Sequence, residues 1–473
     1  MIACFDFGLF GSCGLGCDLR KSHLALLGVL VVTRMSLSIL VYQNPEPAYF
    51  PDSASYERLG IGLLDGTAYR WTTDDEAELF RPPGYPAFIA ATYGLLGRNM
   101  GGLALLQLGL GIGIAFLLYD LGRRLFSPIA GLIAAGLYAL DLFSALWGLA
   151  LLSEPLFTAL LITGVYALVR WQLEPKLKWL IVAGLVGGLS TLVRPIGLLL
   201  LPAWALIVFL TGRNRNLPKS LDTSHFAVRS TLVFGVALLL IVTPWSVRNK
   251  ILWNVAGVSS VSGQNLERYL APAVIMERDG VSIEEARSRL NPPSELSNSS
   301  RTAWYATVIS SNPIQYAKAH LRGTLRTIAG LEYIGWFEFL GWPAERSGLL
   351  VALEEGDPIG IYRNFATNIA NQPIVATTMI FSLGFQLLLY IAGLFGFRRL
   401  YRNHPWTVAL LAATGAILIF VPGVVGESRF RVPVQPILAL LGGVALAPTE
   451  SRRNWASWLG YWVEIIRRKW MGQ

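Results

Sequence analysis

Ten apolar segments of roughly membrane-spanning length recur along the chain, and they constrain the fold more than any single motif. A helix needs about twenty mainly apolar residues to cross a hydrocarbon core of roughly 30 Å. Hydrophobic residues make up 53% of the 473 residues, charged residues only 15%, and the mean hydropathy is +0.49. The sequence therefore predicts an all-α polytopic membrane protein, with helices over 24–42, 103–121, 128–147, 155–169, 179–193, 196–210, 228–245, 376–397, 407–422 and 432–446.

The basic residues predict the topology. A shorter apolar segment, residues 83–96, either spans the membrane or lies along its outer interface. If it does not span, the basic clusters gather on the cytoplasmic side, as the positive-inside rule requires. We therefore expect about ten spanning helices with both ends of the chain in the cytoplasm, and about 11 or 12 spans as the alternative. The formal net charge of +9 then indicates membrane anchoring and not nucleic-acid binding, because Lys and Arg sit at helix ends.

This topology divides the chain into five regions. They are a cytoplasmic tail (1–23), an N-terminal transmembrane module (24–247) with a first outer loop over 43–97, an extracytoplasmic loop region (248–375), C-terminal transmembrane helices (376–447) and a basic cytoplasmic tail (448–473). Short helices are predicted in the loop region over 283–290, 303–309 and 314–328. The three cysteines (Cys4, Cys13 and Cys17) lie in the first tail, and their odd number gives no disulfide framework.

Two carboxylates stand out on the predicted outer side. Asp52 precedes a helix expected to run to about Leu64, so its carboxylate either caps that helix or acts as a base or metal ligand. Glu154 lies between two apolar segments, where an unpaired carboxylate is costly and is a functional candidate by default. The alternative for Glu154 is a helix-start residue stabilised by the helix dipole.

Arginines accompany these carboxylates. Arg81 lies in the segment 80–86, which reads Phe-Arg-Pro-Pro-Gly-Tyr-Pro, and two prolines hold it extended. Four further arginines at outer helix ends run against the positive-inside bias: Arg194, Arg248, Arg429 and Arg431. Guanidinium groups bind phosphate bidentately and stay charged in a partly apolar setting, whereas snorkelling to lipid headgroups is the simpler alternative. Arg34, within the first span, is either an inward-facing charge or a structural partner of Glu154.

In this order, these features resemble the GT-C membrane glycosyltransferases that use polyprenyl-phosphate sugars, the superfamily of protein O-mannosyltransferases and lipid A aminoarabinose transferases. The matching features are Asp52 in the first outer loop, the segment 80–86, Glu154 before Pro-Leu-Phe, and residues 427–431, which read Glu-Ser-Arg-Phe-Arg. The segments 192–195 and 243–249 are also typical of bacterial members. The resemblance extends over nearly the whole chain.

The resemblance implies an integral membrane enzyme that transfers a sugar from a lipid monophosphate donor to an acceptor on the outer face. Asp52 would be the general base and Glu154 a second catalytic residue that lines the acceptor side or binds metal. Substrate contacts would come from Arg81, Tyr56, Tyr85, Arg194, Arg248, Glu427, Arg429 and Arg431. Many relatives carry Asp where this chain has Glu154, so metal coordination by Asp52 and Glu154 stays open, and the sequence requires no cofactor.

The expected partners are a polyprenyl-phosphate sugar, membrane lipids and an acceptor glycan, lipid or protein, with no nucleic acid. The expected location is a bacterial inner membrane with the site facing outward. A transporter or flippase for lipid-linked sugars is the main alternative. Transporters tend to carry inverted repeats and ionisable groups in mid-membrane, whereas the charges of this chain cluster at outer helix ends and in loops.

Overall fold

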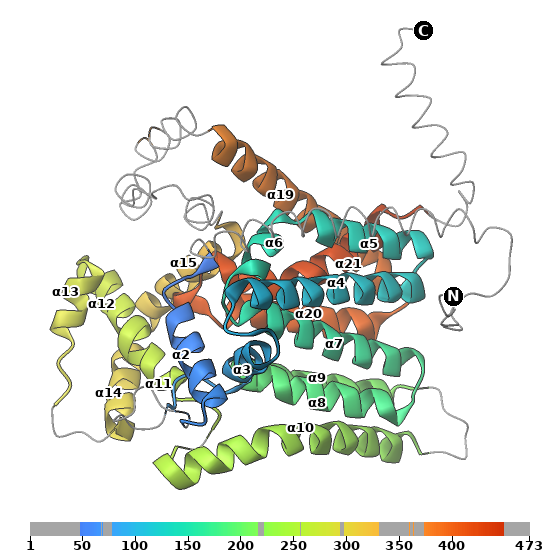
Figure 1. The fold of residues 1–473 in the computed structure, drawn as a ribbon. Coiled ribbons are helices and arrows are strands. Elements are labelled where there is room, and N and C mark those ends of the chain that lie inside the picture. Colours follow the sequence, from blue (N-terminus) through green and yellow to red (C-terminus); the bar gives the residue numbers. More distant parts are fainter. Residues whose placement is uncertain are drawn as a thin grey trace, which may run out of the picture.

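The computed structural model describes residues 48–67, 69, 78–215, 222–255, 257–293, 298–330, 359, 363 and 373–448. Within these residues every regular element is a helix and no strand occurs, which confirms the predicted all-α class (Figure 1). The predicted first span over 24–42, Arg34, the cysteines, and nearly all of the two tails lie outside the described residues.

The apolar segments form a bundle of closely packed helices. Its members are α4 (Met100–Leu125), α5 (Pro128–Leu140), α6 (Leu142–Leu149), α7 (Glu154–Leu173), α8 (Leu177–Val193), α9 (Gly197–Arg213), α10 (Thr223–Trp253), α19 (Pro373–Tyr401), α20 (Pro405–Phe420) and α21 (Gln435–Leu446). Five helical segments in the described part of the chain are long and apolar enough to cross a membrane, or six if α5 and α6 form one span. The chain is therefore a multi-pass membrane protein, and the count of ten spans stays a prediction.

Two segments differ in detail from a simple series of spans. Residues 128–147, predicted as one helix, divide into α5 and α6, which are bent by 59° relative to each other at a break that holds Asp141. The ambiguous segment 83–96 forms α3 (Gly84–Leu96), and its 13 residues give a helix of about 20 Å at 1.5 Å per residue. This length is short of the hydrocarbon core, so α3 is consistent with the prediction that it does not span.

Glycine allows close contacts between helices of the bundle. A Cβ on Gly396 of α19 would lie 1.8 Å from the Leu441 carbonyl oxygen of α21. A Cβ on Gly443 of α21 would lie 2.4 Å from the Ala130 carbonyl oxygen of α5. Small residues commonly mediate such backbone approach in membranes, where van der Waals packing drives helix association. These contacts hold α5, α19 and α21 together.

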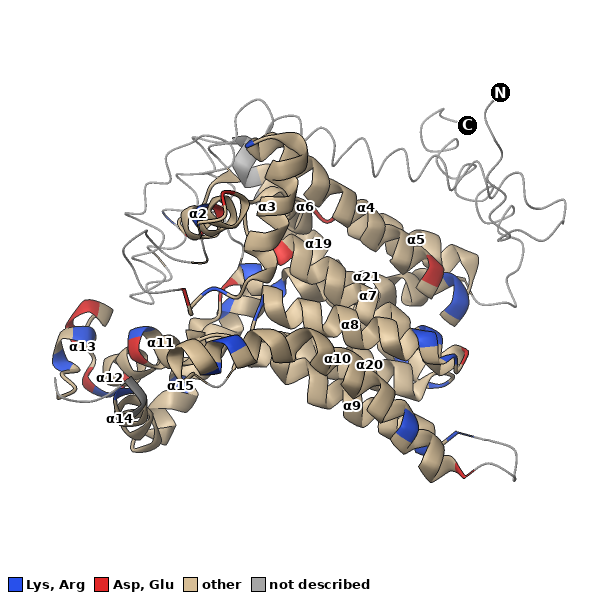
Figure 2. Cartoon of the chain, turned by 60° about the horizontal axis from the view of Figure 1, so that its bottom comes forward, with Lys and Arg blue, Asp and Glu red and all other residues tan. Residues whose placement is uncertain are grey.

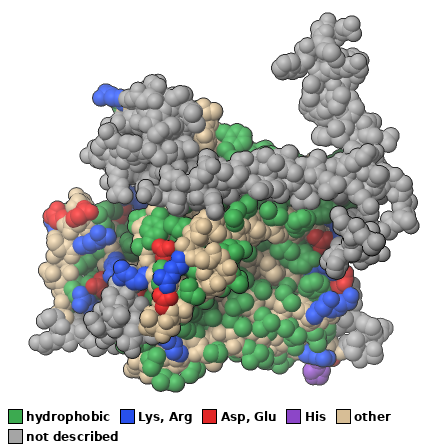
Figure 3. Space-filling model, viewed as in Figure 1, with side chains coloured by type: hydrophobic (Ala, Val, Ile, Leu, Met, Phe, Trp, Pro, Cys, Tyr) green, Lys and Arg blue, Asp and Glu red, His purple; other side chains and the backbone are tan. Residues whose placement is uncertain are grey.

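Apolar side chains cover the outer faces of the bundle between two charged ends. Exposed Leu and Phe residues lie along α10 and α19, including Leu232, Leu240, Leu394 and Phe395. In Figure 3 hydrophobic side chains form a broad band with charged groups on either side. Such faces are expected where helices contact lipid tails.

Charged residues gather at the two ends of the bundle (Figure 2). The basic end is formed by Arg123 and Arg124 at the end of α4, Arg170 near the end of α7, and Arg399 near the end of α19. At the opposite end α7 begins with Glu154, α8 is followed by Arg194, and a 3-10 turn, η4 (Ser428–Val434), precedes α21. The predicted site residues therefore lie at the end away from the basic end.

Shorter helices gather beyond this second end. The first outer loop contributes α2 (Ser53–Leu64), which packs on α3 and agrees with the predicted helix to about Leu64. The loop region contributes α11 (Val261–Asn265), η2 (Leu266–Leu270), α12 (Ala271–Asp279), α13 (Ile283–Arg289), α14 (Asn298–Ser310) and α15 (Pro313–Ala329). The three helices predicted in this region are thereby confirmed as α13, α14 and α15. Of the helices in this region, α15 makes extensive contacts with both η3 (Gly423–Val425) and η4.

Candidate active site

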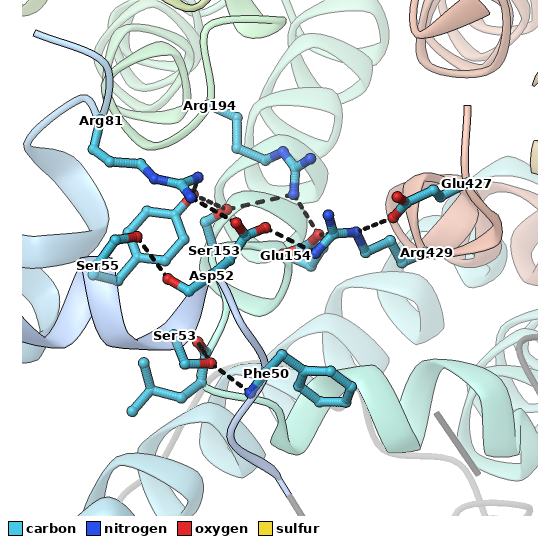
Figure 4. A network of polar contacts seen from close by, with 12 residues as sticks. Phe50, Asp52, Ser53, Ser55, Arg81, Ser153, Glu154, Arg194, Glu427 and Arg429 are labelled. Carbon is cyan, nitrogen blue, oxygen red and sulfur yellow. Dashed lines mark hydrogen bonds and ion pairs between the residues drawn. The ribbon is translucent and has the colours of Figure 1, made fainter. Parts of the chain in front are cut away.

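Asp52 lies between two arginines that come from distant parts of the sequence (Figure 4). Its Oδ1 atom accepts a hydrogen bond from Arg81 Nη2 at 2.7 Å, and its Oδ2 atom accepts one from Arg429 Nη1 at 3.1 Å. Asp52 directly precedes α2, but its carboxylate makes no capping hydrogen bond. The capping interpretation of this side chain is therefore wrong, and the carboxylate is directed into the ion pairs.

Ser53, the first residue of α2, makes the side-chain hydrogen bonds at the start of this helix. The Phe50 backbone N–H donates to Ser53 Oγ at 2.9 Å, and the Ser53 hydroxyl donates to the Leu151 carbonyl oxygen at 2.8 Å. The Leu151 N–H in turn donates to the Ala48 carbonyl oxygen at 3.0 Å. These bonds fasten the start of α2 to the turn before α7, and so bring Asp52 close to the residues around Glu154.

The Arg81 segment is fixed through its backbone. The Arg81 N–H donates to Glu78 Oε1 at 3.1 Å, and the Phe80 N–H contacts the same oxygen. The Tyr69 hydroxyl donates to the Arg81 carbonyl oxygen at 2.8 Å. The Ser259 hydroxyl, from the segment before α11, donates to the Phe80 carbonyl oxygen at 2.6 Å. The guanidinium of Arg81 thus projects from a backbone held by two residues of its own loop, Glu78 and Tyr69, and by the distant Ser259.

Two tyrosines help to hold the Arg81 side chain, Tyr56 directly and Tyr85 through its contact with Tyr56. The Tyr56 hydroxyl accepts a hydrogen bond from Arg81 Nη1 at 3.0 Å and donates to Ser153 Oγ at 3.3 Å. The Tyr85 ring packs edge-on against Tyr56 with 5.0 Å between centroids, and its hydroxyl donates to Gln107 Oε1 at 2.8 Å. Tyr85 is fully buried, so it orients Tyr56 and does not face the open side of the site.

Glu154 forms the buried part of the site. Its side chain is 2% exposed, and its Oε1 atom lies 2.6 Å from Arg194 Nη1 and 3.9 Å from Arg429 Nε. Arg429 Nε also lies 2.7 Å from Glu427 Oε2, on the exposed side of the site. Arg194 Nη1 reaches Ser153 Oγ at 3.4 Å. Glu154 stands in the first turn of α7, so the helix-start interpretation and the functional one are compatible.

Together these six side chains form the carboxylate–arginine cluster: Asp52, Glu154, Glu427, Arg81, Arg194 and Arg429. Burial disfavours the charged form of Asp52, but Arg81 and Arg429 outweigh that effect and hold the pKa of its carboxyl below the usual value. Asp52 is therefore ionised at neutral pH and keeps lone pairs that can accept a proton. The same arginines offer N–H groups to a phosphate, which forms charge-assisted hydrogen bonds with guanidinium groups.

The cluster does not present a divalent-metal site in this arrangement. Among the described residues, no three His, Cys, Asp or Glu side chains converge as metal ligands do. Asp52 and Glu154, the two predicted ligands, are both approached by the Arg429 guanidinium. A cation that bridged them would have to displace Arg429, so this set of side chains does not fit a bridging divalent cation, and we derive no step through one.

Besides Tyr56 and Tyr85, two further predicted substrate contacts lie outside the cluster. Arg248 stacks on the Trp245 ring at 4.4 Å and bonds Asn249, beside Tyr69. Arg431 is buried, and its guanidinium donates to backbone carbonyls at the end of α15. Arg431 therefore does not join the arginines around Asp52, because it projects from η4 in a different direction from Arg429.

The sequence interpretation missed the polar residues that hold the cluster in place. Ser153 contacts the Arg194 side chain, Glu78 and Tyr69 bond the Arg81 backbone, and Ser259 bonds the backbone of the adjacent Phe80. Ser153 adjoins Glu154, and Glu78 and Tyr69 lie in the same acidic loop as Arg81, so closeness in sequence was an available signal for these three. Ser259 lies 179 residues from its partner Phe80, and no local pattern marks it.

Comparison with known proteins gives a family-model match and a likeness of fold. Residues 80–247 match the model of dolichyl-phosphate-mannose-protein mannosyltransferases, a range that contains Arg81, Glu154 and Arg194 but neither Asp52 nor residues 427–431. No curated protein sequence matches the chain. The structure is similar to apo oligosaccharyltransferase from Archaeoglobus fulgidus, at 14% identity and a TM-score of 0.52, over 93% of this chain and 52% of that one.

Two further structures are similar. AglB oligosaccharyltransferase from A. fulgidus, in complex with an inhibitory peptide and a dolichol-phosphate, gives 13% identity and a TM-score of 0.51, over 91% of this chain and 50% of that one. ArnT from Cupriavidus metallidurans, bound to undecaprenyl phosphate, gives 14% identity and a lower TM-score of 0.40, over 88% and 77%. The chain spans about half the length of the oligosaccharyltransferases. The resemblance to GT-C glycosyltransferases is thus confirmed by the model match and by the fold.

Proposed function

We propose that this protein transfers a sugar from a polyprenyl-phosphate donor to a hydroxyl of an acceptor glycan, lipid or protein. The observation that carries the proposal is the placement of Asp52, whose two carboxylate oxygens each meet an arginine while its side chain stays 37% exposed. An ionised, accessible carboxylate beside arginines suits a reaction that removes a proton and releases a phosphate. The mannosyltransferase model match and the oligosaccharyltransferase-like fold support the same reaction class.

The chemistry is a single inverting displacement. Asp52 accepts the proton of the acceptor hydroxyl as its oxygen forms a bond to the anomeric carbon of the sugar. The bond from that carbon to the phosphate oxygen breaks, and its electron pair leaves with the polyprenyl phosphate. Arg81 and Arg429 stabilise the phosphate charge that develops, since their N–H groups already point toward an anionic centre. Asp52 then returns the proton to water.

Binding of the sugar donor also prepares the base. A phosphate competes with Asp52 for the N–H groups of Arg81 and Arg429, so its arrival weakens the two bonds that hold the carboxylate pKa down. The Asp52 carboxylate therefore becomes more basic at the stage of the reaction in which the acceptor hydroxyl has to lose its proton. Arg194 and the buried Glu154 hold the inner side of the cluster, and Arg248, beside Tyr69, supplies a further cation for substrate.

The site faces outward from a bacterial inner membrane in this proposal. Arg123, Arg124, Arg170 and Arg399 lie at the opposite end of the bundle, and the positive-inside rule assigns such an end to the cytoplasm. The outer leaflet would then supply the lipid-linked sugar directly to the cluster.

The test is transfer from a synthetic radiolabelled polyprenyl-phosphate sugar by purified protein in detergent. Two readouts are needed because the acceptor is unidentified: labelling of a membrane extract and slow hydrolysis of the sugar donor. We expect wild type to give both and Asp52→Asn to lose them by about 10²–10⁴-fold, the usual contribution of a general base. Binding of the polyprenyl phosphate should persist in the variant, because Arg81 and Arg429 remain.

Asp65→Asn is the matched control. Asp65 follows the other end of α2 and pairs with Arg98, and both side chains are largely exposed. This variant should retain wild-type transfer. Near-normal transfer by Asp52→Asn would refute the base assignment. Binding without turnover by wild type, across several sugars, would favour transport of a lipid-linked sugar instead.

A further inference from the structure

Arg429 and Arg431 stand two residues apart on η4 and make entirely different contacts. Arg429 reaches Asp52 and lies near Glu154, whereas Arg431 is buried against the end of α15. Arg431 Nη1 donates to the Thr327 and Ile328 carbonyl oxygens at 3.0 and 2.7 Å, and its Nη2 atom donates to the Gly330 carbonyl oxygen at 3.1 Å. It therefore satisfies carbonyl groups that the end of a helix leaves without partners.

The chain before η4 also packs tightly on α15. A Cβ on Gly323 would lie 2.0 Å from the Gly423 carbonyl oxygen, and one on Gly426 would lie 2.2 Å from the Gly323 carbonyl oxygen. Arg326 Nη2 donates to the Val424 carbonyl oxygen at 3.2 Å. Backbone is thus in contact with backbone, and a shift of α15 must move residues 423–426 with it.

We infer that Arg431 is a positioning residue: by bonding the end of α15 it sets the 3-10 turn at the position from which Arg429 reaches Asp52 and Glu154. This inference rests on the proposed function, in which Arg429 and Asp52 act together. It assigns Arg431 no contact with substrate, in contrast to the phosphate contact that the sequence resemblance implied.

The geometry of a 3-10 turn explains why such a hold is needed. At about 3.0 residues per turn, side chains two apart point to different sides, and the hydrogen bonds of the turn are weaker than those of an α-helix. The turn alone fixes Arg429 poorly. The three bonds from Arg431, and its stacking on the Phe143 ring at 4.4 Å, attach the opposite side of the turn to α15 and α6.

The basic end of the bundle provides a matched control. Arg399 Nη1 donates to the Val444, Ala445 and Ala447 carbonyl oxygens at the end of α21, at 2.7, 3.2 and 2.6 Å. Its guanidinium stacks on the Phe126 ring at 4.1 Å. Arg399 therefore makes the same kind of helix-end contact as Arg431, but at the end of the bundle away from Asp52.

The experiment compares Arg431→Gln with Arg399→Gln in the transfer assay across pH. Asp52 faces Arg81 from the first outer loop and Arg429 from η4, with Tyr56, Glu154, Arg194 and Glu427 as the next titratable or charged groups. If Arg431→Gln lets Arg429 move away, Asp52 loses one of the two cations that favour its charged form. Its carboxylate is then protonated at higher pH, and activity is lost earlier as the pH falls.

For Arg431→Gln we expect kcat to fall about 10–100-fold and the acid limb of the pH profile to move up by about one unit. Arg399→Gln should leave the acid limb unchanged, because it affects only a distant helix end. A purely structural role for Arg431 would lower the amount of folded protein without moving the limb. Equal behaviour of the two variants would therefore overturn the inference.

Two milder variants cover the case in which Arg431→Gln does not fold. Arg431→Lys keeps a cation that can still donate to carbonyls, so its acid limb should lie between those of wild type and the Gln variant. Arg326→Gln removes the partly buried hydrogen bond to the Val424 carbonyl oxygen and should move the limb slightly in the same direction. An acid limb at the wild-type position in both would contradict the inference.

Backbone hydrogen exchange separates failure of the inference from failure of the proposed function. Residues 423–434 should exchange faster in Arg431→Gln than in wild type and should be unaffected in Arg399→Gln, whether or not the protein transfers sugar. Unchanged protection there would overturn the positioning role. If the wild-type protein shows no transfer but exchange still rises in Arg431→Gln, the result would count against the proposed function alone.

Discussion

The bundle carries an aspartate, several arginines and a tyrosine at each of its ends, but the two groups are assembled differently. At the basic end Asp120 accepts from Arg124 Nε at 2.5 Å, contacts Arg123, and accepts from the Tyr166 hydroxyl at 2.9 Å. Arg170 donates to the same hydroxyl at 2.8 Å. At the other end Asp52 accepts from Arg81 and Arg429, and Tyr56 accepts from Arg81 but donates to Ser153 instead of to the aspartate.

The difference lies in sequence separation and access. Arg123 and Arg124 stand three and four residues after Asp120, on neighbouring positions of one helix surface. The arginines of Asp52 are 29 and 377 residues away and come from a loop and a 3-10 turn. The Asp52 side chain is 37% exposed, against 19% for Asp120. The Asp120 cluster joins two packed helices, α4 and α7. The Asp52 cluster instead joins segments that are far apart in the sequence, which we take as the mark of a functional site.

The largest contrast is expected when each aspartate loses its charge. Asp52→Asn should reduce transfer by about 10³-fold, the middle of the range for a general base, with little change in stability. Asp120→Asn should keep transfer within about two-fold, and should lower the free energy of unfolding because three arginines lose their shared anion. Transfer kinetics and denaturation of the two proteins in the same detergent check both halves.

The comparison would break if Asp120→Asn lost transfer as strongly as Asp52→Asn. Such a result would mean that the basic end controls the distant site and that its cluster is more than a helix-end contact. Normal transfer by both variants would remove the distinction altogether.

Glu154→Gln should give the next largest effect, a loss in the free energy of unfolding. The substitution leaves Arg194 without its buried partner, a change that costs about 3 kcal/mol in comparable buried pairs. Glu174→Gln is the control at the basic end, since Glu174 pairs with Arg170 and Lys176 near the surface and should unfold much as wild type does. Equal stability of the two variants, measured by denaturation in micelles, would show that the Glu154 pair adds little.

The sequence predicted most of the fold because length and hydrophobicity decide where helices can cross a membrane. Nine of the ten predicted apolar segments correspond to α4–α10 and α19–α21, the segment 24–42 lies outside the described residues, and the short α3 is consistent with a helix that does not span. The sequence did not predict the bend at Asp141, because the apolar residues on both sides of it form one continuous segment of spanning length. Asp141 is buried, so its cost in an apolar segment was a signal that could have been used.

For the site, the sequence identified the charges but not their directions. Asp52, Arg81 and Glu154 were found because isolated charges between apolar helices are costly. Arg429 and Arg431 could not be told apart, because the phase of a 3-10 turn is needed to know that one faces Asp52 and the other α15. The support of Arg81 by Ser259 depends on contact between segments that no local pattern connects.

A change of pH sharpens the comparison through the Arg81 pair. Because Arg81 and Arg429 outweigh burial and hold the Asp52 pKa below its usual value, the stability that this carboxylate contributes is present above its unfolded-state pKa and is lost as pH falls through its folded-state pKa. Wild-type transfer measured as kcat/KM, which reports ionisation of the free enzyme, should therefore persist as the pH is lowered toward the ordinary pKa of an aspartate, about 4. Arg81→Gln removes one cation and should move the acid limb upward by about one unit.

Arg98→Gln is the control for this measurement, since Arg98 pairs with the exposed Asp65 beyond the other end of α2. Its pH profile should match that of wild type. An unchanged acid limb in Arg81→Gln would mean that Asp52 does not set the limb, whatever happens to the rate.

The smallest expected effect removes one hydroxyl from each cluster. Tyr56→Phe loses the oxygen that accepts from Arg81 and donates to Ser153, while its ring keeps the edge-on contact with Tyr85. A single hydrogen bond contributes about 0.5–1.5 kcal/mol, so transfer should fall roughly 3–10-fold. Tyr166→Phe makes the same chemical change beside Asp120 and should leave transfer at the wild-type rate, because its hydroxyl orders only the basic end. A loss of transfer in both variants would show that transfer depends on the rigidity of the bundle as a whole. If neither variant loses transfer, the ring of Tyr56 is enough to orient Arg81, whose guanidinium lies over that ring at 4.4 Å.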